Sequence, residues 1–142
     1  SAVYSKDLKA KLKKKITRDF KNFGKIVWVD HEKKIDFFTA MFGGGPAYFF
    51  YILGCLKKLI KKNGFSDTVS SSLLTSLIEG LLFEIKSKTT SFDESIKKVA
   101  SKGGTTEEAL KVLSKNQVLF KLFEKAINAA KIKSNKISKQ LK

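Results

Sequence analysis

The residues best suited to chemistry in this chain are residues 101–108, which read Ser-Lys-Gly-Gly-Thr-Thr-Glu-Glu. Two glycines free the backbone just before Thr105, and Thr105 and Glu108 have the spacing of a capping box at the start of a helix. A helix N-terminus presents unpaired N–H groups and the positive end of the helix dipole, so it can bind a carboxylate or a phosphate. The segment therefore predicts either an ordinary capped loop or a site for an anionic ligand.

Helical patterns surround this loop from residue 34 onward. Apolar residues recurring every three or four positions predict helices over 35–43, 47–62, 68–88, 92–99, 106–114 and 118–132. The helix over 68–88 carries an apolar face broad enough to pack on more than one neighbour, which indicates a central or dimer-interface helix. Residues 89–91 are expected to form a turn, and the polar segment 133–142 is expected to fray.

The first thirty residues have a different pattern. Residues 2–4 and 26–29 are strand-like, and the segment between them, 6–23, has the apolar spacing of a helix that ends at Gly24. Strand, helix and strand in this order form a βαβ unit. A lone unit of this kind cannot cover both faces of its sheet, so we expect it to be the edge of a larger α/β domain.

Composition limits the possible partners. The net charge is +16, yet Arg18 is the only arginine among 29 basic residues. Sequence-reading and phosphate-clamping proteins favour arginine, so specific nucleic-acid binding is not expected. Cys55 is the only cysteine, expected to be buried in its apolar run, and His31 is the only histidine. With no partners of the same kinds, neither a disulfide within the chain nor a Cys- or His-based metal site is expected.

The segment 37–56 has no charged residue and is long enough for a transmembrane helix. Three glycines and Pro46 near its centre are expected to break the helix, so we interpret it as two helices of a soluble protein meeting at a tight joint. The N-terminus also lacks the apolar core of a signal peptide. We therefore expect a cytoplasmic protein with no membrane partner.

Two segments carry a resemblance to a known family. Residues 41–50, Met-Phe-Gly-Gly-Gly-Pro-Ala-Tyr-Phe-Phe, resemble the Ser-Gly-Ser-Gly-Pro-Ala-Tyr signature of pyrroline-5-carboxylate reductase. Residues 99–113 resemble that family's Val-x-Ser-Pro-Gly-Gly-Thr-Thr-x-x-x-Leu-x-x-Leu segment, and the distance between the two segments also agrees. Residues 25–30 look like the strand that closes the family's cofactor domain. The resemblance extends from about residue 2 to about residue 137.

The resemblance implies a fold class that is mainly α. Residues 31–137 would form a helical dimerisation and substrate-binding domain, and residues 1–30 a βαβ remnant of the α/β Rossmann cofactor domain. Residues 138–142 would be a frayed basic tail. Because two copies of this domain intertwine in the family, we expect a homodimer, and such dimers often assemble further into rings.

The resemblance also implies a reaction and a site. The family reduces 1-pyrroline-5-carboxylate to L-proline with NAD(P)H. Ser101, Gly103, Gly104, Thr105 and Thr106 would form the loop that holds the substrate carboxylate, in agreement with the helix N-terminus argument. The hydroxyl of Thr106 matches the family threonine that contacts the substrate, which makes Thr106 the candidate catalytic residue.

Several departures from the family pattern qualify this expectation. No Gly-x-Gly-x-x-Gly fingerprint follows a strand in residues 1–142, so we expect the chain alone neither to bind NAD(P)H nor to catalyse the reaction. Lys102 replaces the family proline, Phe42 and Gly44 replace its two serines, and Leu59-Ile60 stands where the family has glycines. The alternative function is a non-catalytic helical dimerisation module derived from this family.

Overall fold

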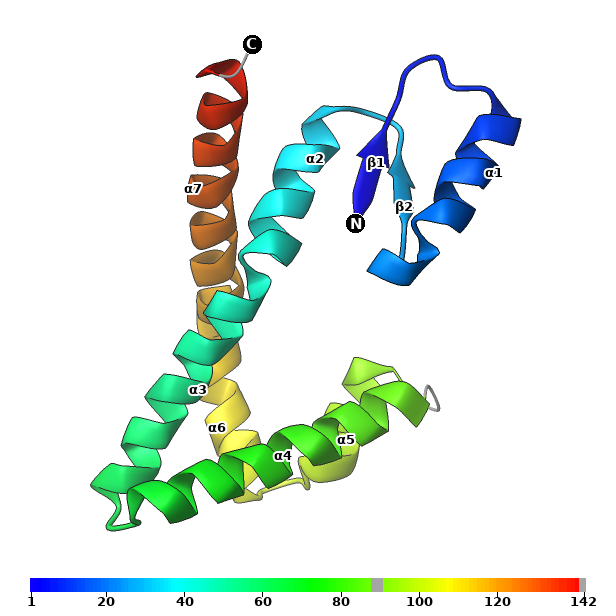
Figure 1. Cartoon of the computed structure of the whole chain (residues 1–142). Helices are drawn as coiled ribbons and strands as arrows, with labels where there is room; N and C mark the ends of the chain where they lie inside the picture. Colours follow the sequence, from blue (N-terminus) through cyan, green and yellow to red (C-terminus); the bar gives the residue numbers. More distant parts are fainter. Residues whose placement is uncertain (88–90, 141–142) are drawn as a thin grey trace. The chain divides into compact units, whose positions relative to one another are not determined.

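The computed structural model describes residues 1–87 and 91–140 (Figure 1). The described chain is mainly α-helical, with a single parallel sheet of two short strands near the N-terminus. It divides into two compact units, one made of Ser1–Pro46 with Leu122–Lys142 and one made of Ala47–Lys121. The predicted fold class, mainly α with a small βαβ element, is confirmed.

The βαβ element belongs to the first unit. β1 (Ala2–Tyr4) and β2 (Val27–Val29) pair in parallel, with Ala2 opposite Val27, and α1 (Ala10–Asp19) connects them together with the 3-10 turn η1 (Lys21–Phe23). The Nε1–H of Trp28 on β2 donates to the Thr17 hydroxyl on α1 at 2.8 Å, which fixes the helix to the sheet. The helix is shorter than the predicted 6–23, and Gly24, at φ 102°, provides the left-handed residue that turns the chain into β2.

The glycine-rich segment joins two helices, as predicted, although the joint itself keeps a helical form. α2 (Lys33–Phe38) runs into the π-helical turn η2 (Thr39–Gly43), and α3 (Gly45–Lys62) follows after Gly44. The Gly44 N–H donates to the Thr39 carbonyl at 3.2 Å, and Gly44 itself keeps right-handed helical dihedral angles. Pro46 is tolerated because it is the second residue of α3, in a first turn where a missing N–H costs little.

The last helix is longer than predicted. α7 (Val118–Gln140) follows the 3-10 turn η3 (Lys115–Gln117) and continues well beyond Ile132. In the first unit, Ser134 Oγ and Asn135 Nδ2 donate to the Asp36 carboxylate on α2 at 2.8 and 3.2 Å. These bonds use the polar residues that the sequence pattern assigned to a frayed tail, which explains why the helix extends. Residues 141–142 lie outside the described part of the chain.

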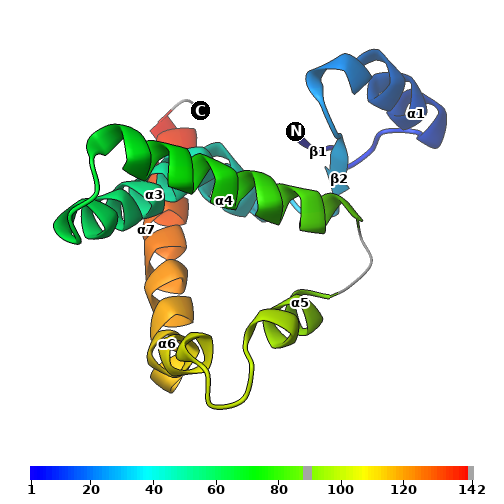
Figure 2. The same ribbon diagram turned by 90° about the horizontal axis from the view of Figure 1, so that it is seen from below.

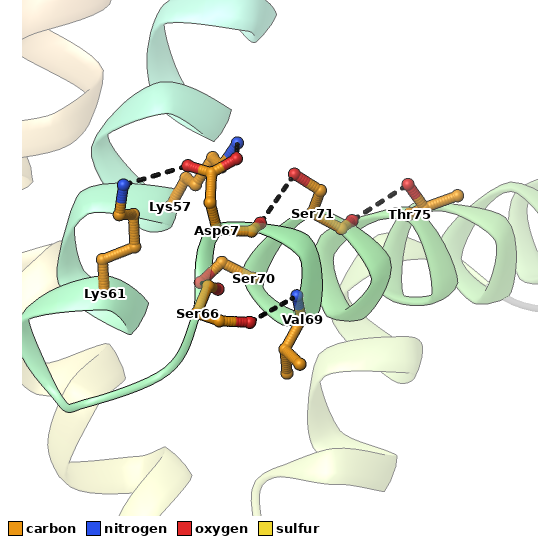
Figure 3. A network of polar contacts seen from close by, with 8 residues as sticks. All are labelled: Lys57, Lys61, Ser66, Asp67, Val69, Ser70, Ser71 and Thr75. Atoms are coloured by element: carbon orange, nitrogen blue, oxygen red, sulfur yellow. Dashed lines mark hydrogen bonds and ion pairs between the residues drawn. The ribbon is translucent and has the colours of Figure 1, made fainter.

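In the second unit, α4 (Asp67–Ser87) begins with a polar network shared with α3 (Figure 3). The Ser66 hydroxyl accepts the Val69 N–H at 3.3 Å, so Ser66 caps the N-terminus of α4. Lys57 and Lys61 on α3 donate to the two carboxylate oxygens of Asp67 at 2.8 and 3.0 Å. These bonds hold the pKa of Asp67 below its ordinary value.

The remaining helices of this unit are short. α5 (Phe92–Val99) has the predicted bounds, and α6 (Thr105–Ser114) starts one residue earlier than predicted. Ser91 and Glu94 form a complete capping box, which lowers the pKa of the Glu94 carboxyl, mainly through the bond from the Ser91 N–H. The predicted end of the preceding helix at Lys88 and most of the predicted turn at 89–91 fall outside the described residues.

The described chain buries few of its apolar side chains. Its buried apolar residues are Ala40, Leu74 and Ile127, and Cys55 is exposed, contrary to the expectation that it is buried. α4 exposes the apolar residues Val69, Leu73, Leu77, Ile78, Leu81, Leu82, Phe83 and Ile85. Helices over Lys33–Lys62 and Asp67–Ser87 also have the length and composition that could cross a membrane, with 11% of each apolar window buried. The chain's own core therefore does not cover these surfaces.

Candidate functional site

The predicted site residues lie together in the second unit, in the loop between α5 and α6 and the first turn of α6 (Figure 2). The Gly104 N–H donates to the Ser101 carbonyl at 3.0 Å and closes a tight turn. Gly103 has φ 74°, in the left-handed region that favours glycine. A Cβ on Gly104 would lie 2.6 Å from Ser101 Oγ and 3.0 Å from the Ser101 carbonyl oxygen. Both glycines are thus required by the backbone of this turn.

The start of α6 differs from the predicted capping box. Gly104 is the N-cap residue and no side chain caps it, so Thr105 occupies the first helical position instead of the cap. The Glu108 carboxylate bonds to Lys111 Nζ at 2.6 Å rather than reaching back to the loop. The reason is that a side chain can accept N–H groups of the first turn only from the cap position, and the helix begins one residue too early for Thr105 to do so.

Glu107 takes part in the loop, which the sequence analysis missed. Its Oε2 accepts the Gly103 N–H at 2.6 Å, a short distance typical of a hydrogen bond to a charged group. The Glu107 side chain is half-buried, whereas Ser101 and Thr105 are exposed. The spacing was a usable signal, because an acidic side chain at the third helical position commonly reaches back toward the residues before the helix.

Thr106 is half-buried and lines a pocket of about 480 Å³ formed with α4 and α5. Leu81 and Ile96 supply apolar walls, and Glu84, Ser95 and Lys98 supply polar groups. The Glu84 carboxylate accepts the Ser95 hydroxyl at 3.2 Å and lies 3.7 Å from Lys98 Nζ. The pocket therefore places a hydroxyl, a carboxylate and an ammonium group within one small volume beside the glycine loop.

The arrangement suits binding of a small anion more than metal chemistry. The α6 N-terminus contributes the positive end of a helix dipole, and the exposed Lys102 adds a cation in the preceding loop. Among residues 1–87 and 91–140, no group of three or more His, Cys, Asp or Glu side chains is placed to hold a metal ion. The second glycine-rich segment, 41–50, forms the π turn and the start of α3.

Comparison with known proteins decides the family. A family model described as "Pyrroline-5-carboxylate reductase dimerisation" matches residues 32–137. The chain belongs to the pyrroline-5-carboxylate reductase family. A pyrroline-5-carboxylate reductase of Pseudomonas aeruginosa is 35% identical over 118 residues, covering 83% of this chain and 43% of that protein. One from Staphylococcus aureus (strain COL) is 31% identical over 137 residues, covering 95% of this chain and 49% of that protein.

Solved structures of pyrroline-5-carboxylate reductases have the same fold. The enzyme from Coxiella burnetii superposes with a TM-score of 0.84 at 27% identity, covering 95% of this chain and 50% of that one. The Plasmodium falciparum enzyme with NADP bound gives 0.75 at 29% identity, covering 94% and 51%. The chain thus spans about half the length of the pyrroline-5-carboxylate reductases that it matches.

Proposed function

We propose that this chain is the dimer-forming and substrate-binding part of a pyrroline-5-carboxylate reductase. The observation that carries the proposal is the α5–α6 turn, in which Gly103 is left-handed and Gly104 has no room for a side chain. Such a turn brings backbone N–H groups to the surface at a helix N-terminus, where a carboxylate is stabilised. The family match over residues 32–137 supports pyrroline-5-carboxylate as the acid.

In this proposal Ser101, Gly103, Gly104, Thr105 and Thr106 surround the substrate carboxylate. The half-buried Thr106 also faces the pocket beside the loop, so its hydroxyl can contact the ring of a small substrate while the N–H groups hold the acid. Binding at two ends fixes the orientation of the substrate, which is the main contribution that this unit can make to a hydride transfer.

The hydride donor in this proposal is NAD(P)H, bound by a Rossmann domain. Residues 1–142 contain no Gly-x-Gly-x-x-Gly fingerprint of such a domain. The NADP-bound Plasmodium falciparum relative supports the choice of cofactor. We expect the chain alone not to oxidise NADPH in the presence of pyrroline-5-carboxylate, and we expect activity only when a nucleotide-binding domain is supplied. NADPH oxidation by the chain alone, followed at 340 nm, would show that this part of the proposal is wrong.

Calorimetric titration with L-proline, the reaction product, tests the carboxylate site. We expect measurable binding to the native chain and weaker binding to Thr106→Ala, because the variant loses the hydroxyl beside the loop. Thr75→Ala is the matched control, since its hydroxyl donates to the Ser71 carbonyl within its own helix, α4. Equal binding by all three chains contradicts a role for Thr106. No binding by the native chain, combined with a stable dimer, favours the alternative of a non-catalytic dimerisation module.

We further propose that the exposed apolar face of α4 is covered by a second copy of the chain. Each leucine removed from water contributes about 1.5–3 kcal/mol, so a face of this size can hold an obligate homodimer. Leu77→Lys should produce monomers in sedimentation measurements, whereas Ser72→Lys, at a polar position of the same helix, should not. A native chain that sediments as a monomer, or binds lipid vesicles instead, contradicts this proposal. From the family resemblance we also expect a cytoplasmic location and the assembly of dimers into rings.

A further inference from the structure

The carboxylate of Glu107 already accepts a hydrogen bond from the Gly103 N–H, one of the donors of the candidate site. Its Oε2 lies 2.6 Å from the Gly103 nitrogen, and the side chain is half-buried at the third position of α6. A backbone N–H has one hydrogen and donates one strong bond at a time. The Gly103 N–H is therefore engaged by an acid from the chain itself.

The inference rests on the proposed function of the loop as a carboxylate-binding site. The ligand expected there is a carboxylate, the same chemical group as the side chain of Glu107. A second carboxylate arriving at the loop would meet both an engaged donor and a like charge, and like charges at short range repel.

We propose that Glu107 is an internal competitor that lowers the affinity of the loop for carboxylate ligands. Binding of the ligand acid at the Gly103 N–H requires the Glu107 side chain to leave that donor. The Glu107 bond also holds the left-handed Gly103 in place while the site is empty, so the loop keeps its shape without a ligand. The affinity for substrate and product is thereby set below what the loop alone would give.

Glu108 offers a matched comparison. It is adjacent in sequence, carries the same charge in the same helical turn, and is exposed. Its carboxylate pairs with Lys111 and makes no contact with Gly103. A general electrostatic effect of removing one negative charge near the loop would be similar for Glu107→Gln and Glu108→Gln, whereas release of the Gly103 N–H is specific to Glu107.

The experiment is calorimetric titration of the 142-residue chain with L-proline at constant ionic strength, comparing native, Glu107→Gln and Glu108→Gln. Glutamine keeps the size of the side chain and a weaker acceptor but removes the charge. We expect Glu107→Gln to bind L-proline about fivefold more tightly than Glu108→Gln, the ratio that corresponds to roughly one net hydrogen bond. L-prolinamide, which lacks the carboxylate, should bind both variants equally. Thermal unfolding verifies that each variant is folded.

The outcomes separate the inference from the function on which it rests. Tighter binding by Glu107→Gln alone supports competition. Equal or weaker binding by Glu107→Gln, while the native chain binds L-proline, overturns the inference and leaves the proposed function in place. Equal tightening by both variants also overturns it, because the effect is then one of net charge. Failure of the native chain and of both variants to bind L-proline overturns the proposed function together with the inference.

Discussion

Replacing Gly104 with alanine places a methyl carbon 2.6 Å from Ser101 Oγ and 3.0 Å from the Ser101 carbonyl oxygen. The hydroxyl can rotate away at little cost. The carbonyl oxygen cannot, because it accepts the Gly104 N–H that closes the turn. The backbone must therefore shift, and forcing an extra methyl group into an occupied space costs about 1–3 kcal/mol.

The assay is urea unfolding of native and Gly104→Ala chains at one fixed protein concentration, because association contributes to the stability of a dimer. Gly54→Ala is the control, since a Cβ at that position of α3 meets no atom within 4 Å. Alanine is favoured over glycine inside a helix by about 0.8–1 kcal/mol, so the control should be slightly more stable than the native chain. The two glycine substitutions are thus expected to have opposite signs.

Repeating the substitution in a Ser101→Ala chain separates the methyl group's contact with the Ser101 hydroxyl from its contact with the Ser101 carbonyl oxygen. Ser101→Ala removes the Oγ but leaves the carbonyl, so Gly104→Ala should remain destabilising in that background if the backbone contact dominates. L-proline binding should weaken along with stability, because the shift displaces the loop N–H groups. Native-like stability and binding of Gly104→Ala would refute the assignment of this glycine to a close backbone approach.

Three further substitutions test other parts of the fold. Bonds from two lysines lower the folded pKa of Asp67, so its stabilisation is present above the ordinary carboxyl pKa of about 4 and is lost as pH falls through the lower folded value. The urea stabilities of native and Asp67→Asn chains should therefore differ most above about pH 4 and converge as the pH falls further, and a constant difference would contradict this. Ser91→Ala removes the N-cap of α5 and should cost about 1 kcal/mol in thermal unfolding, whereas no loss would contradict the cap. Asp36→Ala removes the acceptor for two side chains of α7 and should cost about 1–3 kcal/mol. Hydrogen exchange near Ser134 should accelerate, and unchanged exchange would speak against this link.

Local signals in the sequence were sufficient for much of the fold. The strand–helix–strand order, the turn at Gly24 and the bounds of α5 all depend on residues within one or two turns of each other. Such features are decided by capping, turn chemistry and apolar period. The loop at 101–106 was found in the same way, because its residues are contiguous and its glycines mark the turn.

The features that were missed depend on contacts distant in sequence or on a rarer backbone form. The extension of α7 requires Asp36, on another helix, to accept Ser134 and Asn135. The grouping of Glu84, Ser95 and Lys98 beside Thr106 joins three helices whose packing no local pattern specifies. The π form of the joint at Thr39–Gly43 was not predicted, because glycine and proline only indicate that a regular α-helix is disfavoured and do not specify the wider turn that accommodates them.

The π turn over Thr39–Gly43 also bears on how this region tolerates insertions and deletions. Ala40 and Gly45 are both buried although they are five positions apart. At about 100° per residue, a regular helix would place them about 140° from each other, on different sides. The wider turn absorbs this offset, as though one residue had been inserted into an ordinary helix. Loss of one residue here would leave the burial pattern nearly in phase, so we expect deletion of a single residue from this turn to be tolerated without rebuilding the helix.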